Sequence, residues 1–332
     1  ISLGLVGSEM CIRDRTQTMN IGLDLGMLNN RLVVNFDYFQ RKSKDMVGPG
    51  MELPIILGTG VPNVNNLDMT SKGWELQVSW RDRIKDFNYG ITLALSDNKV
   101  TIDKYPNPSK DLGQIYYDGA TLGDLWGYKS AGIAKTDEEM NKHLAGNKPS
   151  WGDNWAAGDI MYIDQNDDGV INDGDNTLAD HGDKVLLGNK TPRYNFGLNL
   201  DAAYKGFDLK IFFQGTLKRD YMPDPNAAGM MFWGAVGYWQ TNFFEPHMDF
   251  FRPADTTSPL GPNVNAYYPR PLEDNKNRQA QDRYLQNAAY CRLKNVTLGY
   301  TLPSHLTKKF FVNNLRFFVS AENLFTITSL CD

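Results

Sequence analysis

Paired segments with a period of two in hydrophobicity constrain the fold of this chain more than any other feature. In residues 20–27, apolar side chains take every second position, and Asn, Asp or Gly take the positions between them. Residues 32–39 repeat the pattern after Asn29-Asn30, a pair that accepts the positive φ angles of a tight hairpin turn. Period two puts alternate side chains on opposite faces of a strand. The two segments therefore predict a β-hairpin.

The same unit occurs three more times along the chain. The pairs are residues 73–80 with 87–96, 195–204 with 207–215, and 292–302 with 315–325. The connections between pairs are predicted to be about 30 residues (41–73), about 100 (98–194) and about 70 (216–288), where ordinary connections have about 4 to 6. Tight turns at one end of an antiparallel sheet and long loops at the other are typical of an outer-membrane β-barrel.

A soluble β-sandwich also alternates and is the main alternative fold. The barrel is favoured because the residues opposite the apolar face are small or carry amides, as in a water-filled lumen, and because the loops are longer than a sandwich normally carries. A barrel would turn its apolar strand face to lipid as a band roughly 25 Å tall, whereas a sandwich would bury that face.

Composition and motifs exclude several function classes. The net charge is -5 and no basic run occurs, so we expect no nucleic-acid partner. No window approaches 18 consecutive apolar residues, which argues against a membrane-spanning helix. Cys11, Cys291 and Cys331 lack paired spacing, the four histidines are isolated, and no nucleophile or dinucleotide motif appears. We expect no required cofactor and no enzyme activity.

The segment "DQNDDGVINDGD" has the spacing of a calcium loop. Its predicted ligands, at loop positions 1, 3, 5, 7 and 12, are Asp164, Asn166, Asp168, the Val170 carbonyl and Asp175. Alternating oxygen ligands converge when the chain coils around a hard cation, and Gly169 permits the sharp bend. The sequence therefore predicts Ca²⁺ as a candidate ligand. An Asp/Asn/Gly-rich turn that binds no metal is the alternative.

Aromatic residues crowd two of the long connections. The candidates for contact with a ligand or a partner are Trp151, Trp155, Trp233, Tyr238, Trp239, Phe243 and Phe244. Aromatic faces can stack on sugar rings or anchor a protein interface. An aromatic girdle at a membrane surface, or packing among the loops, explains the same residues without a ligand.

Several blocks, in a consistent order, resemble one known family. "GWELQVSWRDR", "GDIMYIDQNDDGVIND", "LLGNKTPRYNFGLNLDAAYKGFDLKIFFQG" and "YCRLKNVTLGYTLPSHL" followed by "LRFFVSAENLFTITS" are similar to the C-terminal barrel half of SusC/RagA-type TonB-dependent transporters. The resemblance runs from about Thr18 to Thr328. It implies part of a large antiparallel transmembrane β-barrel of about 22 strands with long extracellular loops.

The same resemblance implies a location and partners. The protein would lie in the outer membrane of a Gram-negative, Bacteroidetes-like cell, in contact with outer-membrane lipid. It would import an oligosaccharide or a peptide, with a SusD-like surface lipoprotein as its lid. The TonB complex would supply energy through an N-terminal plug domain.

The sequence departs from this family at its ends. We expect residues 1–15, which contain "LVGSEMCIRDR", to be a sequencing-adapter artefact, and residues 16–332 to be a partial barrel domain without the plug and the last strands. Eight clear strands cannot close a large barrel, because an open sheet edge in lipid leaves backbone groups unpaired.

Three functions fit the sequence. The first is a fragment of a TonB-dependent active transporter, and the second is a secreted or surface β-rich binding or adhesion module. The third is a surface glycosidase, which would need two carboxylates about 5 to 9 Å apart in a pocket.

Overall fold

The computed structural model describes residues 14–48, 50, 63–114, 116–223, 245–272 and 276–330. It divides into two compact units. The described residues within 14–106, 191–219 and 287–330 form the first, which we call the sheet unit. Residues 107–190 and 220–286 belong to the second, the loop unit.

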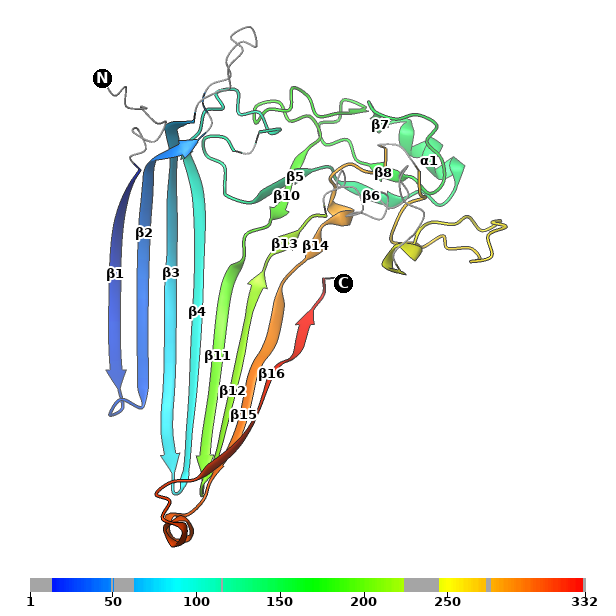
Figure 1. Cartoon of the computed structure of the whole chain (residues 1–332). Coiled ribbons are helices and arrows are strands. Elements are labelled where there is room, and N and C mark those ends of the chain that lie inside the picture. The colour runs from blue at the N-terminus through cyan, green and yellow to red at the C-terminus, as the bar shows by residue number, and fades with distance from the viewer. Residues whose placement is uncertain are drawn as a thin grey trace, which may run out of the picture. The chain divides into compact units, whose positions relative to one another are not determined.

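The sheet unit is one antiparallel sheet of eight strands in the order β1-β2-β3-β4-β11-β12-β15-β16 (Figure 1). These eight strands are neighbours in the sheet in the same order in which they follow one another along the chain. The strands with intermediate numbers belong to other small sheets. The strands are β1 (Arg15–Met27), β2 (Leu32–Gly48), β3 (Val64–Ile84), β4 (Phe87–Lys104), β11 (Arg193–Tyr204), β12 (Phe207–Lys218), β15 (Tyr290–Thr301) and β16 (Arg316–Thr328). All four predicted strand pairs are confirmed.

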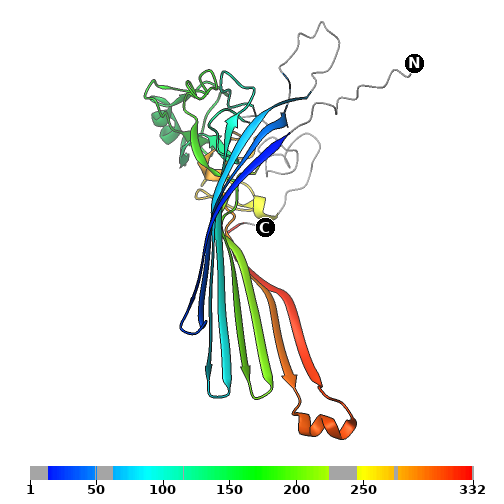
Figure 2. The ribbon, with the colours of Figure 1, turned by 90° about the vertical axis from the view of Figure 1, so that its left-hand side faces the viewer.

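Short turns join three of these pairs at the same end of the sheet (Figure 2). Asn29 and Asn30 adopt φ of 56° and 60°, as the hairpin prediction requires. Lys205 and Gly206 do the same between β11 and β12, with φ of 45° and 90°. The connection from β15 to β16 is longer and contains α2 (Ser304–Thr307) and the 3-10 helix η6 (Lys308–Phe310). We call this end the turn end and the opposite one the loop end.

The predicted start of the first long connection at Arg41 is wrong. β2 continues to Gly48 and β3 begins at Val64, with Gln40 opposite Lys72 and Ser43 opposite Met69. β4 also continues to Lys104. The alternation pattern did not indicate these extensions because their apolar residues, such as Leu67, Met69, Val100 and Ile102, form only short runs between charged and amide residues.

The loop unit consists of short elements around a small core. These are β5 (Asp124–Gly127), β6 (Ser130–Ile133), α1 (Asp137–Leu144), β7 (Lys148–Pro149), β8 (Ile160–Tyr162), β9 (Val170–Ile171), β10 (Val185–Asn189), β13 (Asp220–Tyr221), η4 (Glu245–Met248), η5 (Asp282–Tyr284) and β14 (Gln286–Asn287), whose last residue belongs to the sheet unit. Its core includes Tyr128, Ile160, Tyr162, Ile171 and Phe251. Within the described residues, no helix has the length and apolar character needed to cross a membrane.

Substitution of Gly73 tests how closely the strands of the sheet pack. A Cβ atom at Gly73 would lie 2.6 Å from the Asp97 carbonyl oxygen and 2.6 Å from Phe39 Cζ, so Gly73→Ala must push strand β4 or the Phe39 ring aside. We expect this overpacking to cost about 1–3 kcal/mol. The measurement is the midpoint temperature of unfolding. It is followed by gel electrophoresis of samples heated to increasing temperatures, in which the folded protein migrates faster than the unfolded protein. Gly146→Ala is the control, since nothing lies within 4 Å of its Cβ position; equal midpoints for the two variants would contradict the packing.

Candidate functional site

The strand register gathers the apolar residues of all eight strands on one face of the sheet. Leu25 lies opposite Val34, Val34 opposite Val78, and Val78 opposite Leu93. The row continues through Leu198, Phe213, Leu293 and Phe325. Neighbouring rows are similar, because each pair of strands keeps the same alternation. The result is a continuous apolar face, eight strands wide.

The apolar face is not a protein core in this chain. Ile21, Ile91 and Leu298 are 61%, 44% and 52% exposed, on three different strands of the face. Side chains facing the core of a sandwich would be buried by the second sheet. The compact hydrophobic clusters of the described residues lie mainly in the loop unit. The apolar face therefore needs an apolar environment that the described part of the chain does not supply.

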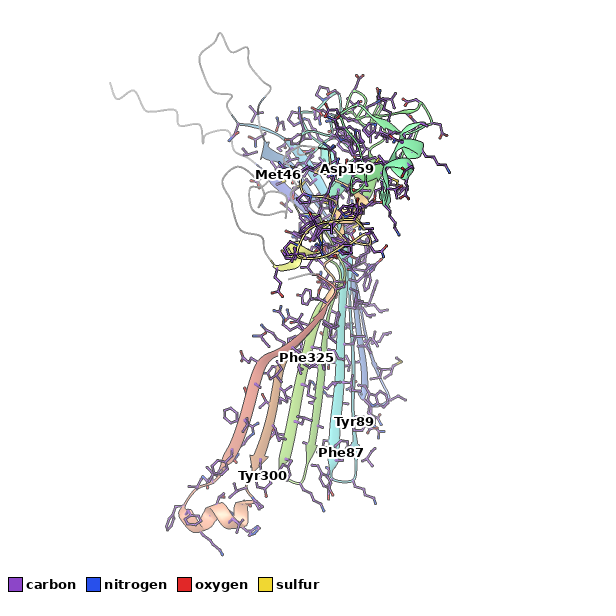
Figure 3. The ribbon with its side chains drawn as sticks, turned by 90° about the vertical axis from the view of Figure 1, so that its right-hand side faces the viewer. Met46, Phe87, Tyr89, Asp159, Tyr300 and Phe325 are labelled. Atoms are coloured by element: carbon purple, nitrogen blue, oxygen red, sulfur yellow. The ribbon has the colours of Figure 1, made fainter. Side chains whose placement is uncertain are left out.

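Aromatic side chains edge the apolar face at the turn end. One row across the sheet runs through Phe87, Tyr204, Phe207, Tyr300 and Phe317. The Phe207 and Tyr300 rings are 4.5 Å apart between centroids. Figure 3 shows Phe87, Tyr89 and Tyr300 at this end of the strands, and Met46 at the loop end. Rings that are apolar in the body, some with a polar tip, are typical of a membrane boundary.

The opposite face of the sheet is polar. A hollow of about 370 Å³ over strands β2, β3, β4 and β11 is lined by Asn35, Asp37, Glu75, Gln77 and Asn195, among others. Asp37 lies directly opposite Glu75. The predicted hydrophilic face is thus present, and it is rich in groups that accept hydrogen bonds.

The predicted calcium loop closes on the side chain of Asp164. Its carboxylate accepts hydrogen bonds from the backbone N–H groups of Asn166 (3.0 Å), Asp167 (2.7 Å) and Gly169 (2.6 Å). Gly169 has φ of 82°, which fits the expected bend. Burial raises the pKa of Asp164, but these N–H donors outweigh burial and hold the pKa below its usual value.

Asp183 is a residue of this loop that the sequence spacing did not indicate. It is fully buried and accepts hydrogen bonds from the backbone N–H of Gln165 (2.6 Å) and of Asn172 (2.8 Å). Burial raises the pKa of its carboxyl above the usual value, and the negative charges of Asp164 and Asp168 raise it further. Asp183 therefore fixes both sides of the loop.

The predicted metal ligands are not gathered into one set. Across the described residues, no group of three or more His, Cys, Asp or Glu side chains is arranged to hold a metal ion. Asp175, the expected ligand at position 12, is exposed. The loop has the predicted coil, and calcium binding stays a prediction.

The two described aromatic candidates lie against the core of the loop unit. The Trp151 ring is 4.8 Å from Tyr128 and 5.3 Å from Tyr162, and the Trp155 ring is 6.1 Å from Tyr162. Such contacts are expected if these aromatic residues pack among the loops without a ligand. Trp233, Tyr238, Trp239, Phe243 and Phe244 lie outside the described residues. A role in ligand contact stays a prediction for the whole set.

A buried ion-pair network fixes the loop unit internally. Asp159 has no exposed side-chain surface; its oxygens accept hydrogen bonds from Arg270 Nε and Nη2, each at 2.6 Å, and from Asn277 Nδ2 at 3.0 Å. Lys276 Nζ lies 3.4 Å from the same carboxylate. The sequence did not indicate this network because Asp159 is more than 100 residues away from its partners along the chain. A fully paired buried carboxylate has a structural role, because removing one of its partners would leave a buried charge without compensation.

Comparison with known proteins identifies relatives of this chain. No protein-family model matches it. TonB-dependent receptor P3 of Formosa agariphila is 26% identical over 95% of this chain. TonB-dependent receptor SusC of Bacteroides thetaiotaomicron is 21% identical over 88% of it. The chain is thus similar over most of its length to proteins named TonB-dependent receptors, SusC among them. The SusC-type resemblance given by the sequence blocks is thereby confirmed.

Solved structures share the fold. The structure of the RagAB peptide transporter matches 96% of this chain with a TM-score of 0.66 at 20% identity. The RagAB peptide importer in its "open-open" state matches 95% with a TM-score of 0.62. The predicted fold, an antiparallel sheet of the TonB-dependent barrel type, is confirmed. These relatives are receptors and a transporter, in agreement with the prediction that the chain is not an enzyme.

The chain spans about a third of the length of the SusC-type relatives. It covers 30% of receptor P3, 26% of SusC and 32% of the matched RagAB chain. Activity, substrates and partners are properties of the whole proteins.

Proposed function

We propose that this chain is part of the barrel wall of an outer-membrane TonB-dependent transporter that imports a nutrient. The observation that carries the proposal is the two-faced sheet, whose apolar face is continuous across eight strands and exposed, while its other face is polar. Such a sheet matches a barrel wall with lipid on one side and a wet lumen on the other.

The dimensions of the apolar face support a membrane position. On β3 the band extends from Trp74 to Ile84 and is interrupted by Asp82, which forms an ion pair with Arg31 at the turn end. This stretch is roughly 33 Å long at about 3.3 Å per residue, and a strand tilt of about 40° reduces its height to roughly 25 Å. That height equals the apolar band of outer-membrane barrels.

The outer strands of the sheet add a requirement. Among the described residues, β1 pairs with β2 and β16 pairs with β15, so each has one free edge. Unpaired backbone groups in lipid cost several kcal/mol each. We infer that further strands of the same barrel pair with β1 and β16 in the membrane.

The substrate is proposed to be an oligosaccharide or a peptide, with a SusD-like lipoprotein and the TonB complex as partners. Support comes from the RagAB structures, which are named as a peptide transporter and importer, and from homology to SusC. The amides and carboxylates of the polar face can hydrogen-bond either substrate class. A surface binding module is the competing function, and it requires the apolar face to be covered by protein.

Adjacent positions on β11 test the proposal. Leu198 is on the apolar face and Asn199 on the polar face. In a background without native cysteines (Cys11→Ala, Cys291→Ala and Cys331→Ala), we expect Leu198→Cys to react with a lipid-soluble maleimide and to resist a charged, membrane-impermeant one. Asn199→Cys is the matched control, with the opposite preference. Labelling is measured by mass shift in isolated outer membranes. Protection of Leu198→Cys from both reagents would mean a protein-covered face and would favour the binding module.

We propose calcium as a ligand of residues 164–175, on the strength of the oxygen-rich loop that Asp164 closes. We expect added CaCl₂ to slow backbone hydrogen exchange of this loop, MgCl₂ to have less effect, and Asp168→Asn to abolish the change. Asp153→Asn, an exposed carboxylate outside the loop, is the control. Exchange that does not respond to CaCl₂ would show a turn without metal.

A further inference from the structure

Three lysines lie together at the loop end of the apolar face. The register places Lys72 of β3 directly opposite Lys99 of β4. Lys42 of β2 is diagonal to Lys72, because Gln40 is the residue opposite Lys72 and Lys42 follows it on the same face. On adjacent strands, directly opposite residues such as Lys72 and Lys99 are about 5 Å apart at Cβ, and diagonal residues such as Lys42 and Lys72 about 7 to 8 Å. We call these three residues the lysine row.

The lysine row begins where the apolar band ends. Tyr38 and Trp74 form the last aromatic pair of the face, opposite each other on β2 and β3. The next position on the same face of β3 is Lys72, about 7 Å further along the strand. Along β3 the order on this face is therefore aliphatic residues, then Trp74, then Lys72, while Asp97 of β4 lies opposite Trp74.

Protein groups do not neutralise the lysine row. Lys42, Lys72 and Lys99 are exposed, and within the described residues none of them forms an ion pair. Two carboxylates of β4 near this end have other partners. Asp97 binds Arg193, and Asp103 accepts the Thr70 hydroxyl.

Like charges directly opposite each other destabilise a sheet. The arrangement of Lys72 against Lys99 therefore costs free energy in the isolated chain. An anion between the ammonium groups removes this cost. A tetrahedral phosphate suits such a position, because lysine ammonium groups donate in several directions and act as point charges.

We propose that the lysine row binds the phosphate groups of membrane lipids at the loop-end boundary of the apolar band. This inference rests on the proposed function, since it needs the apolar face to lie in a bilayer. Charge complementarity and continuity with the apolar band select a lipid, because the acyl chains of a lipid bound here would lie along Trp74, Leu76 and Val78.

The test uses the complete receptor that carries this chain, extracted from outer membranes in mild detergent. The probes are phosphorylated lipid A and the same lipid after enzymatic dephosphorylation, and bound lipid is counted by native mass spectrometry. We expect Lys72→Gln/Lys99→Gln to bind phosphorylated lipid A roughly tenfold or more weakly. The dephosphorylated lipid should bind the original and the variant equally. Lys85→Gln/Lys210→Gln is the control, with the same charge change at the turn and on the polar face.

The outcomes separate this inference from the proposed function. Fast electrophoretic mobility of the unheated protein, and its recovery from outer membranes, report a membrane barrel; their absence overturns the proposed function. A folded barrel whose lysine variant binds phosphorylated lipid A like the original overturns the lysine row as a lipid site. Displacement of the lipid by an equal concentration of inorganic phosphate would show a free-anion site and would also overturn it.

Discussion

The register of the antiparallel ladder is the constraint on which the rest of this structure depends. Side chains alternate with a period of two, so a slip of one residue between any two strands would move a whole strand's apolar set to the other face. From β1 to β16 the pairing keeps that set on one side, even across the bulges between Phe212 and Phe213 and between Leu293 and Asn295. One face is thereby dedicated to an apolar environment and the other to water.

Other features of the sheet follow from this separation. The aromatic row at the turn end and the Tyr38–Trp74 pair toward the loop end bound the apolar band, and charged groups occur beyond these bounds. The polar face does not have to pack into a hydrophobic core, so the opposed carboxylates Asp37 and Glu75 can lie on it beside amide groups. The loop unit supplies its own stability through a buried aromatic core and the Asp159 network.

The sequence predicted the features that depend on local pattern. The hairpin turns were predictable because a tight turn needs positive φ angles, and Asn and Gly adopt these angles more readily than other residues. Asn29-Asn30 and Lys205-Gly206 have such angles. The extensions of β2, β3 and β4 were not, because their apolar residues alternate only over short runs that charged and amide residues interrupt. The contacts of Asp159 with Arg270, and of Asp183 with the loop at Asn172, depend on three-dimensional folding that spacing alone does not encode. The packing of Trp151 against Tyr162 could be expected only as one of several alternatives.

Cryo-electron microscopy of the complete receptor in a lipid nanodisc would show which face of the sheet contacts lipid. We expect the row through Leu25, Val34, Val78 and Leu93 to contact the lipid belt, while Asn35, Gln77 and Asn195 line an aqueous lumen. We also expect β1 and β16 each to have a second neighbouring strand. A structure in which protein covers the apolar row, or in which the polar row faces the lipid, would contradict this interpretation.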